Sequence, residues 1–442
     1  MNEHPEHTVE QKEPNFFRQI LNLIPFWKVQ RTDWKVTVIR TSLERLGYKT
    51  ILPYLSLYIV ALGATKSQLG IITSIGMLVM GILGPFVGGW IDRNGAKRVY
   101  IIGIIFTFLS YVTYAVAPNW QIYAVAMVLY YFGNGLSSQS CAIICGYCLK
   151  NCDRAKGMLI CESLAAGLLG MIGPMIGAWI FTHISGVTDT ALAVANDFRP
   201  LFYASALFTT ISFFVVLFKL SNQRMGSLKT TGFALRDGYE IIKNNISARK
   251  YILISAIGAL PQAMLIPYYS VYAAERKLAL PAVLAAMITA QALASTVLGY
   301  PVGILADKYG RKKVLYVLVP AVWLSIALLV LAPVHNSFLL VLSGFLMGFL
   351  EIGQPLFAAV QREIVNPKVM GIWIGTTKFT NAIFSAVMAV VAGSVYDHLG
   401  PVWTFAIFIA CDALIRMPLL ISIPETLGNE IAADDEDEGC CS

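Results

Sequence analysis

Long runs of apolar residues alternate with short polar segments along almost the whole chain. An α-helix rises 1.5 Å per residue, so about 20 apolar residues can cross the roughly 30 Å hydrocarbon core of a bilayer. Twelve runs are long enough, and each predicts a membrane-spanning helix. They cover residues 36–61, 67–90, 99–117, 120–149, 157–181, 201–220, 251–273, 282–306, 314–332, 338–360, 371–395 and 402–423. We therefore expect an all-α integral membrane protein with twelve transmembrane helices.

The same pattern divides the chain into two halves of six predicted spans. A polar stretch at residues 221–250 separates the halves and is expected to be a linker. The sequence GPFVGGWIDRNGAKR at 84–98 returns as GYPVGILADKYGRKK at 299–313, with Gly84, Gly88, Asp92 and Gly95 displaced by 215 residues. Such a duplication predicts two pseudo-symmetric six-helix bundles, with a cavity between them.

The distribution of Lys and Arg predicts the orientation of these helices. If both termini are cytoplasmic, the cytoplasmic segments hold 24 of the 33 Lys and Arg residues, and the external loops hold four. Positive charge marks the cytoplasmic side of membrane proteins. The expected organisation is a multi-pass protein of the plasma membrane with both termini cytoplasmic. Its parts are an N-terminal segment with an interfacial helix (1–35), a first bundle (36–220), the cytoplasmic linker (221–250), a second bundle (251–423) and an acidic tail (424–442).

The composition is typical of an integral membrane protein, and the sequence lacks the motifs of several other functions. The chain is 57% hydrophobic and only 13% charged, whereas soluble domains carry about 25% charged residues. The net charge of +7 follows from the basic cytoplasmic loops and does not require a nucleic-acid partner. The sequence has no Gly-Lys dipeptide of a phosphate-binding loop and no Gly-x-Ser-x-Gly elbow. We therefore expect no cofactor, no metal and no enzymatic activity, and energy must come from gradients.

The twin loops resemble the signature loop of the major facilitator superfamily, and the resemblance extends over nearly the whole chain. It implies that Asp92 lies against the N-terminus of the eleventh span and Asp307 against that of the fifth, where free N–H groups attract an anion. Together they would latch the cytoplasmic side shut. The implied gate residues are Gly88, Asp92, Arg93, Gly95, Lys97, Arg98, Gly303, Asp307, Lys308, Gly310, Arg311 and Lys312. Gly88 and Gly303 would permit close helix approach, and Gly95 and Gly310 a tight turn.

Ionisable residues inside a span are costly and are functional candidates by default. The first span carries Arg40, Glu44, Arg45 and Lys49 within a half-circle of the helix. Glu44, Arg45 and Lys49 align with uncharged residues of the seventh span, so the repeated scaffold does not need charge there. An Arg40–Glu44 structural pair is the alternative. Asp412 and Arg416, spaced i,i+4 in the twelfth span, are expected to form a structural ion pair.

Two further buried charges, Glu351 in the tenth span and Lys378 in the eleventh, complete the candidate substrate and coupling site. Arg45, Lys49 and Lys378 against Glu44 and Glu351 give a net charge of +1, which favours an anionic or amphipathic solute. Glu44 and Glu351 are the proton-carrying candidates, because burial disfavours the charged form of a carboxyl group. Further candidates for the wall of the cavity are Tyr54, Asn134, Gln139, Gln262, Tyr268, Gln291 and Gln354.

Two weaker patterns concern cysteine and glycine. Cys141, Cys145, Cys148 and Cys152 lie on one face of the fourth span, but they extend over about 16 Å, too far for one metal site. Packing of small side chains is the preferred interpretation over transport of a soft metal. In the fifth span, Gly173, Pro174 and Gly177 resemble part of the glycine–proline motif of proton-linked exporters.

The sequence thus predicts a secondary transporter that works by alternating access, is coupled to protons and moves a small organic solute, anionic or amphipathic. Its expected partners are that solute, protons and membrane lipids, and a monomer is expected. One alternative is a proton-driven exporter of drugs or lipids. Another is a membrane receptor or scaffold that binds a solute without transporting it.

Overall fold

The structure, a computed structural model, describes residues 27–149, 160–161, 166–221, 239, 242–243, 245–365 and 369–423. Helices make up nearly all of these residues. Those of the first half are α3 (Thr32–Ala61), α4 (Lys66–Asn94), α5 (Ala96–Val116), α6 (Trp120–Cys148), α8 (Ala166–Trp179) with η2 (Ile180–Ile184), η3 (Thr190–Leu192) and α9 (Ala195–Lys219).

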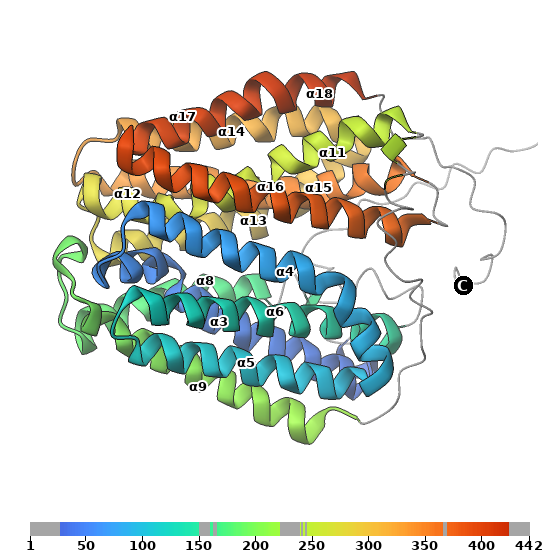
Figure 1. Ribbon diagram of the computed structural model, residues 1–442, viewed down its shortest axis with the longest axis horizontal. Coiled ribbons are helices and arrows are strands. Elements are labelled where there is room, and N and C mark those ends of the chain that lie inside the picture. The colour runs from blue at the N-terminus through green and yellow to red at the C-terminus, as the bar shows by residue number, and fades with distance from the viewer. Residues whose placement is uncertain are drawn as a thin grey trace, which may run out of the picture.

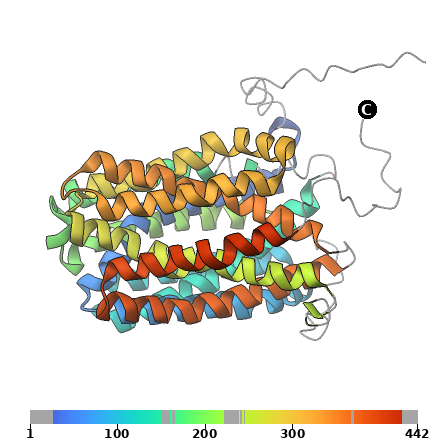
Figure 2. The ribbon, with the colours of Figure 1, turned by 90° about the horizontal axis from the view of Figure 1, so that it is seen from above.

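The second half repeats this arrangement. Its helices are α11 (Ile246–Gly258), η4 (Pro261–Leu265), α12 (Ile266–Lys277), α13 (Pro281–Tyr309), α14 (Arg311–Leu331), α15 (Ser337–Glu363), α16 (Met370–His398), α17 (Pro401–Cys411), η6 (Asp412–Arg416) and α18 (Met417–Ser422). The segments from α11 to α12 and from α17 to α18 run on as single rods, with a π-helical turn inside each. Figures 1 and 2 show the long helices following the long axis of the molecule, and Figure 1 shows the two halves side by side.

Nine of the described helices are long and apolar enough to cross a membrane. Three predicted spans fall outside this set, namely the first, the fourth and the fifth. The first of these, α3, carries six charged side chains, and the fifth is described as the shorter apolar stretch Leu169–Ile184. The all-α membrane architecture is confirmed, whereas the count of twelve spans stays a prediction.

Side-chain caps fix where several helices begin. Thr65 and Gln68 form a reciprocal capping box at the start of α4, with each side chain accepting from the other residue's backbone N–H. Asn119 and Asn336, at equivalent places in the two halves, accept from backbone N–H groups at the starts of α6 and α15. Such caps satisfy N–H groups that no carbonyl within the helix can reach. The caps therefore place the short turns at one end of the bundle.

The hydrophobic cores reveal how the halves meet. One large cluster joins residues of both halves, including Tyr58 and Phe181 of the first and Tyr268 and Phe405 of the second. We call the end of the bundle that contains this shared cluster and the loops 62–65, 278–280 and 399–400 the closed end. At the opposite end, near the turns at Gly95 and Gly310, each half has a separate cluster of its own. We call this opposite end the motif end.

Glycines show where the contact between the halves stops. A Cβ on Gly70 of α4 would lie 2.3 Å from the Ala389 carbonyl oxygen of α16, and one on Gly81 would lie 2.3 Å from the Ala382 Cβ. Farther along α4, a Cβ on Gly89 would meet no atom within 4 Å. The second half matches, because Gly299 and Gly303 of α13 also have nothing within 4 Å. The halves therefore touch from the closed end to mid-molecule and separate toward the motif end.

Candidate functional site

An ion pair joins the two halves near the middle of the molecule. The Lys49 Nζ of α3 lies 3.5 Å from the Glu351 Oε1 of α15, and the Gln291 Nε2 of α13 donates to the same oxygen at 3.1 Å. Lys49 is 14% exposed and Glu351 38% exposed. The structure thus brings together three of the predicted site residues from three helices, across the boundary of the duplication.

The other carboxylate proposed to carry protons, Glu44 in the first span, is paired within its own helix. Arg40 and Glu44, one turn apart on α3, form an ion pair, and the Arg40 guanidinium lies 4.8 Å from the centre of the Tyr100 ring. Arg40 is only 3% exposed. This is the structural pair that the sequence left open as the alternative for these two residues.

Two exposed cations, Arg45 and Lys378, lie on helices of opposite halves. Arg45 precedes Lys49 by one helical turn on α3, and Lys378 precedes Ala382 by one turn on α16. Residues four apart share a helix face. Each cation therefore lies one turn toward the motif end from a contact between the halves, at the level where the halves begin to separate. Both side chains are exposed, and neither forms an ion pair within the part of the chain described above. Helix position therefore places one exposed cation on each half, close to where the contact between the halves ends.

The predicted wall residues fall into different places. Gln262 is exposed on η4, and Asn134 and Gln139 are partly buried on α6. The prediction that Tyr54 and Tyr268 line the cavity is wrong for this conformation, because they are 1% and 0% exposed. Instead, the Tyr54 hydroxyl donates to the Pro281 carbonyl at 3.0 Å, and the Tyr268 hydroxyl donates to the Lys66 carbonyl at 3.3 Å. Both tyrosines join the halves at the closed end.

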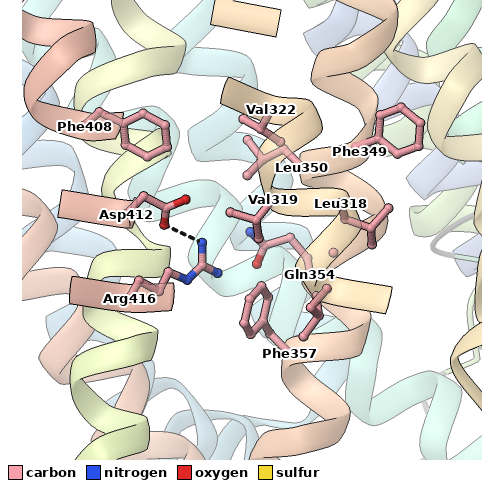
Figure 3. A pocket seen from close by; sticks show the side chains of 12 residues that line it. Leu318, Val319, Val322, Phe349, Leu350, Gln354, Phe357, Phe408, Asp412 and Arg416 are labelled. Carbon is pink, nitrogen blue, oxygen red and sulfur yellow. Dashed lines mark hydrogen bonds and ion pairs between the residues drawn. The ribbon is translucent and has the colours of Figure 1, made fainter. Parts of the chain in front are cut away.

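Gln354 is exposed and follows Glu351 by one helical turn on α15. It lines a cavity of about 20 Å³ between α14, α15 and the rod that contains η6, across from the ion pair of Asp412 and Arg416 (Figure 3). Arg416 Nη1 lies 3.0 Å from Asp412 Oδ1, and the Trp323 indole N–H donates to Asp412 Oδ2 at 2.9 Å. The structural ion pair predicted for the twelfth span is confirmed. Gln354 belongs to its surroundings, inside the second half.

Polar contacts that the sequence did not indicate close the other end. Lys66 Nζ lies 2.6 Å from Glu275 Oε1, which ties the start of α4 to α12. The Asp397 carboxylate, at the end of α16, accepts from the Ser67 backbone N–H at 2.7 Å and so caps the N-terminus of α4. The physics is that of the expected cytoplasmic latch, an anion at a helix N-terminus of the opposite half. No feature of the sequence says which loop residues meet across the halves.

The signature loops form the turns at the motif end. Gly95 and Gly310 adopt φ of +84° and +102°, values that side-chain-bearing residues rarely adopt, as a tight turn requires. The Lys97 ammonium donates to the Leu217 and Leu220 carbonyls at 3.1 and 2.6 Å, at the end of α9. Its counterpart Lys312 donates in the same way to the Ile421 and Ile423 carbonyls at the end of α18. These two lysines therefore cap the last helix of each half.

The latch itself lies beyond what the structure describes. The side chains of Asp92 and Asp307, and the position of Gly88, are outside the described part, and Gly303 makes no close approach to another helix. Arg93, Arg98 and Lys308 are exposed, and Arg311 is partly buried. The latch and the gating role of these residues stay predictions.

Comparison with known proteins identifies the family to which the chain belongs. A model of the Major Facilitator Superfamily matches residues 38–286 and 251–420, nearly the whole chain. The chain belongs to the Major Facilitator Superfamily. The multidrug resistance protein MdtG of Escherichia coli K12 is 25% identical over 347 residues, which cover 75% of this chain and 80% of MdtG. Membership makes this chain a membrane transporter, built on the fold of that superfamily.

Solved structures of other members share the fold. The nucleoside transporter NupG superposes with a TM-score of 0.70 at 15% identity, covering 88% of this chain and 99% of NupG. The human organic anion transporter MFSD10 gives a TM-score of 0.59 at 17% identity, with coverage of 88% and 99%. A POT peptide transporter gives 0.67 at 16%, with coverage of 88% and 94%. At such identities the likeness concerns the fold and not the solute.

Proposed function

We propose that this protein is a proton-coupled secondary transporter of amphipathic organic anions, located in the plasma membrane with both termini cytoplasmic. The ion pair between Lys49 and Glu351 is the observation on which the proposal rests. It joins the two halves near mid-molecule, so it must lengthen or re-form whenever the halves tilt against each other. An ionisable pair inside a membrane protein that spans a moving boundary is suited to coupling.

The conformation described above is the inward-facing one in this proposal. The Lys and Arg distribution places the motif end in the cytoplasm. The shared core at the closed end then seals the external side, and the separated halves open toward the cytoplasm. Alternating access requires the reverse arrangement as well, in which the contacts of Tyr54, Tyr268, Lys66 and Asp397 break and the motif end closes.

Glu351 is the proposed proton-carrying group. When it is ionised, attraction to Lys49 holds the halves together at this level. When it is protonated, the attraction is lost and the halves can move apart at lower cost. Glu44 is less suited to this task, because its partner Arg40 lies on the same helix and the pair does not sense the movement of one half against the other.

Arg45 and Lys378 are the proposed anion-binding residues, since they are exposed cations on opposite halves, each one turn toward the motif end from a contact between the halves. The aromatic rings nearby suit the apolar body of a solute. Tyr48 stacks on Tyr130 with ring centres 5.3 Å apart, and Tyr130 meets Tyr131 at 5.8 Å. A solute with one acidic group and an aromatic or aliphatic body would match both features.

A second candidate function is the export of lipophilic drugs. It is favoured by the likeness to MdtG, whose name describes a multidrug resistance protein, and by the glycines of α8. A Cβ on Gly173 would lie 2.9 Å from the Leu46 carbonyl oxygen, and one on Gly177 would lie 2.3 Å from the Thr50 carbonyl oxygen. The partial glycine–proline motif thus packs α8 tightly against α3.

The test uses purified protein in proteoliposomes and a panel of labelled organic anions and lipophilic cations, with and without an imposed pH gradient. We expect gradient-driven movement of an anion, and we expect Glu351→Gln to abolish it while leaving solute exchange intact, because exchange needs no net proton transfer. Glu44→Gln is the matched control and should retain gradient-driven movement.

Three outcomes would count against the proposal. Wild-type coupling in Glu351→Gln would exclude Glu351 as the coupling group. Movement of cations only would favour drug export instead. Binding without any exchange would support a receptor, the other class of function that the sequence left open.

A further inference from the structure

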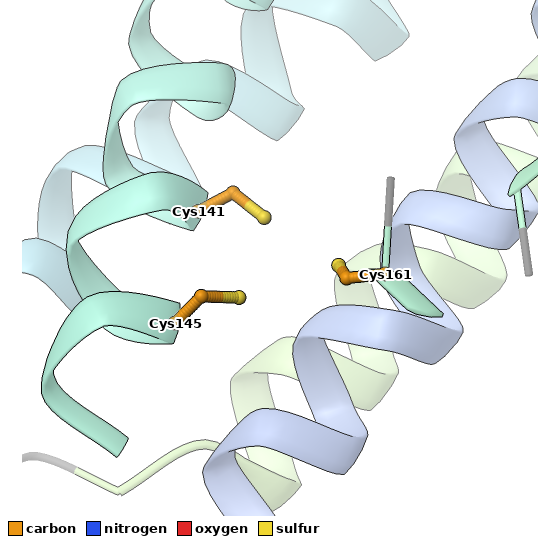
Figure 4. A group of neighbouring side chains, drawn as sticks. All are labelled: Cys141, Cys145 and Cys161. Carbon is orange, nitrogen blue, oxygen red and sulfur yellow. The ribbon is translucent and has the colours of Figure 1, made fainter. Parts of the chain in front are cut away.

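Three buried thiols from two parts of the chain converge inside the first half. Cys141 and Cys145 project from α6 toward Cys161, which lies in the short described segment 160–161 (Figure 4). Their sulfur atoms all lie within 4.8 Å of one another, and the residues are 7%, 2% and 1% exposed. The helical spacing of cysteines on the fourth span did not predict this, because the third sulfur comes from outside that helix.

Besides one another, these sulfurs have long contacts to two threonine hydroxyl groups among the described residues. Thr41 Oγ1 lies 3.6 Å from the Cys141 sulfur and 3.8 Å from the Cys161 sulfur, and the Cys145 thiol lies 3.9 Å from Thr37 Oγ1. Thiols are weak hydrogen-bond donors and acceptors. The hydroxyls therefore leave the sulfur lone pairs available to a ligand that binds sulfur strongly.

A buried cation lies beside the cluster. The Arg40 guanidinium interacts electrostatically with Cys141, and its Nε is buried without a hydrogen-bond partner among the described residues. Positive charge near a thiol favours the thiolate, which is the form that binds metals and metalloids. Arg40 already pairs with Glu44. It therefore does not fully neutralise a further negative charge on the three thiolates.

Charge balance then selects the kind of ion. Three thiolates around a monovalent or divalent ion leave net negative charge in a buried, apolar place, where uncompensated charge is costly. A trivalent ion leaves none. Soft sulfur ligands in a group of three suit a thiophilic ion with three-fold coordination.

We propose that Cys141, Cys145 and Cys161 form a binding site for a trivalent thiophilic metalloid, arsenic(III) or antimony(III). Arsenous acid, As(OH)₃, is uncharged, as is the product. Three thiols replace its three hydroxyl groups: three As–O bonds break, three As–S bonds form, and three water molecules leave. No oxidation or reduction takes place. The bound metalloid would tie α6 to the segment that precedes α8.

The test uses the full-length protein in detergent, reduced with a phosphine, incubated with arsenite and desalted. We expect about one arsenic per chain by mass spectrometry, with three fewer thiols available to a thiol reagent. The arsenic should be released by a small dithiol. With the adjacent dithiol Cys440 and Cys441 replaced by Ser in every protein tested, Cys161→Ser should retain no arsenic after desalting, whereas Cys148→Ser should retain as much as the parent protein. Cys148 is a matched control, because it is buried on the same helix outside the cluster.

A second measurement does not depend on substituted proteins. Arsenite should raise the midpoint of heat-induced unfolding of the wild-type protein, and the dithiol should reverse this rise, because a ligand of the folded state stabilises it. The proposal is overturned if wild type retains no arsenic, or if Cys161→Ser retains as much as wild type. Retention of Cd²⁺ but not arsenic would overturn the choice of a trivalent ion.

Discussion

The charged residues of this protein divide into pairs that lie within one helix and pairs that join distant helices. Arg40 with Glu44, and Asp412 with Arg416, are spaced i,i+4, so helix geometry alone makes each pair predictable from the sequence. The pair of Lys49 and Glu351 is different, because about 300 residues separate its members. The sequence singles out each residue as a costly charge, but only the packing of α3 against the second half shows that they meet.

Lys97 gives a prediction at the same scale. Substitution with Met keeps the apolar stem but removes the ammonium group that donates to the Leu217 and Leu220 carbonyls. Those carbonyls end α9 and have no helical partner. Hydrogen bonds from charged donors are worth about 1.5–3 kcal/mol, so we expect Lys97→Met to lower the midpoint of heat-induced unfolding in detergent by several degrees. Arg98→Met, at the exposed neighbouring position, should change it little. Equal midpoints for the two variants would contradict the capping role.

At the scale of whole helices, glycine positions decide how closely the halves approach. The sequence indicated close approach near the signature loops, whereas the structure places it nearer the closed end. Gly70 lies against Ala389 and Gly81 against Ala382, while Gly89, Gly299 and Gly303 face open space. A glycine pattern predicts where helices are able to touch. It does not say in which conformation of an alternating-access cycle they do so.

Two alanine substitutions on α4 should therefore have opposite effects. A Cβ at residue 70 would meet the Ala389 carbonyl oxygen, a backbone atom that cannot swing aside. Overpacking of this kind typically costs about 1–3 kcal/mol, so Gly70→Ala should lower thermal stability. Gly89→Ala meets no atom and gains helix propensity, about 1 kcal/mol, so it should be neutral or stabilising. If both variants are destabilised to the same extent in thermal unfolding, the contact between α4 and α16 is not as described.

At the scale of the whole molecule, most of what can be predicted about the fold follows from the duplication in the sequence. Apolar runs and the repeat of the loop lead to the all-α membrane fold of the superfamily, which the comparisons confirm. Contacts between the halves could not be predicted in the same way. Tyr54 and Tyr268 read as wall residues, yet they seal the closed end. The sequence around each tyrosine does not depend on the conformation. Only the relative position of the halves decides whether the tyrosine lines a cavity or seals the closed end.

The closed end also determines how easily the molecule changes conformation. Asp397 caps the N-terminus of α4 from the opposite half, and Lys66 pairs with Glu275 beside it. Both contacts must break before the closed end, which is the external side in the proposed orientation, can open. An anion at an exposed helix N-terminus is worth about 0.3–1 kcal/mol. The contribution of Asp397 to the equilibrium between the two conformations should therefore be modest but measurable.

Asp397→Asn should accordingly increase the fraction of molecules that open at the external side, by roughly two- to fivefold. The measurement is the rate at which an impermeant maleimide labels a cysteine introduced at Ala389, which is fully buried in the shared core, in a background without native cysteines. His398→Gln, at the exposed neighbouring position, should leave the rate unchanged. Because Asp397 acts only on the closed end, raised salt should speed labelling of the wild type more than that of Asp397→Asn. If Asp397→Asn is labelled no faster than wild type, the carboxylate does not hold the external side shut, and the seal rests on the tyrosines and the shared apolar core alone.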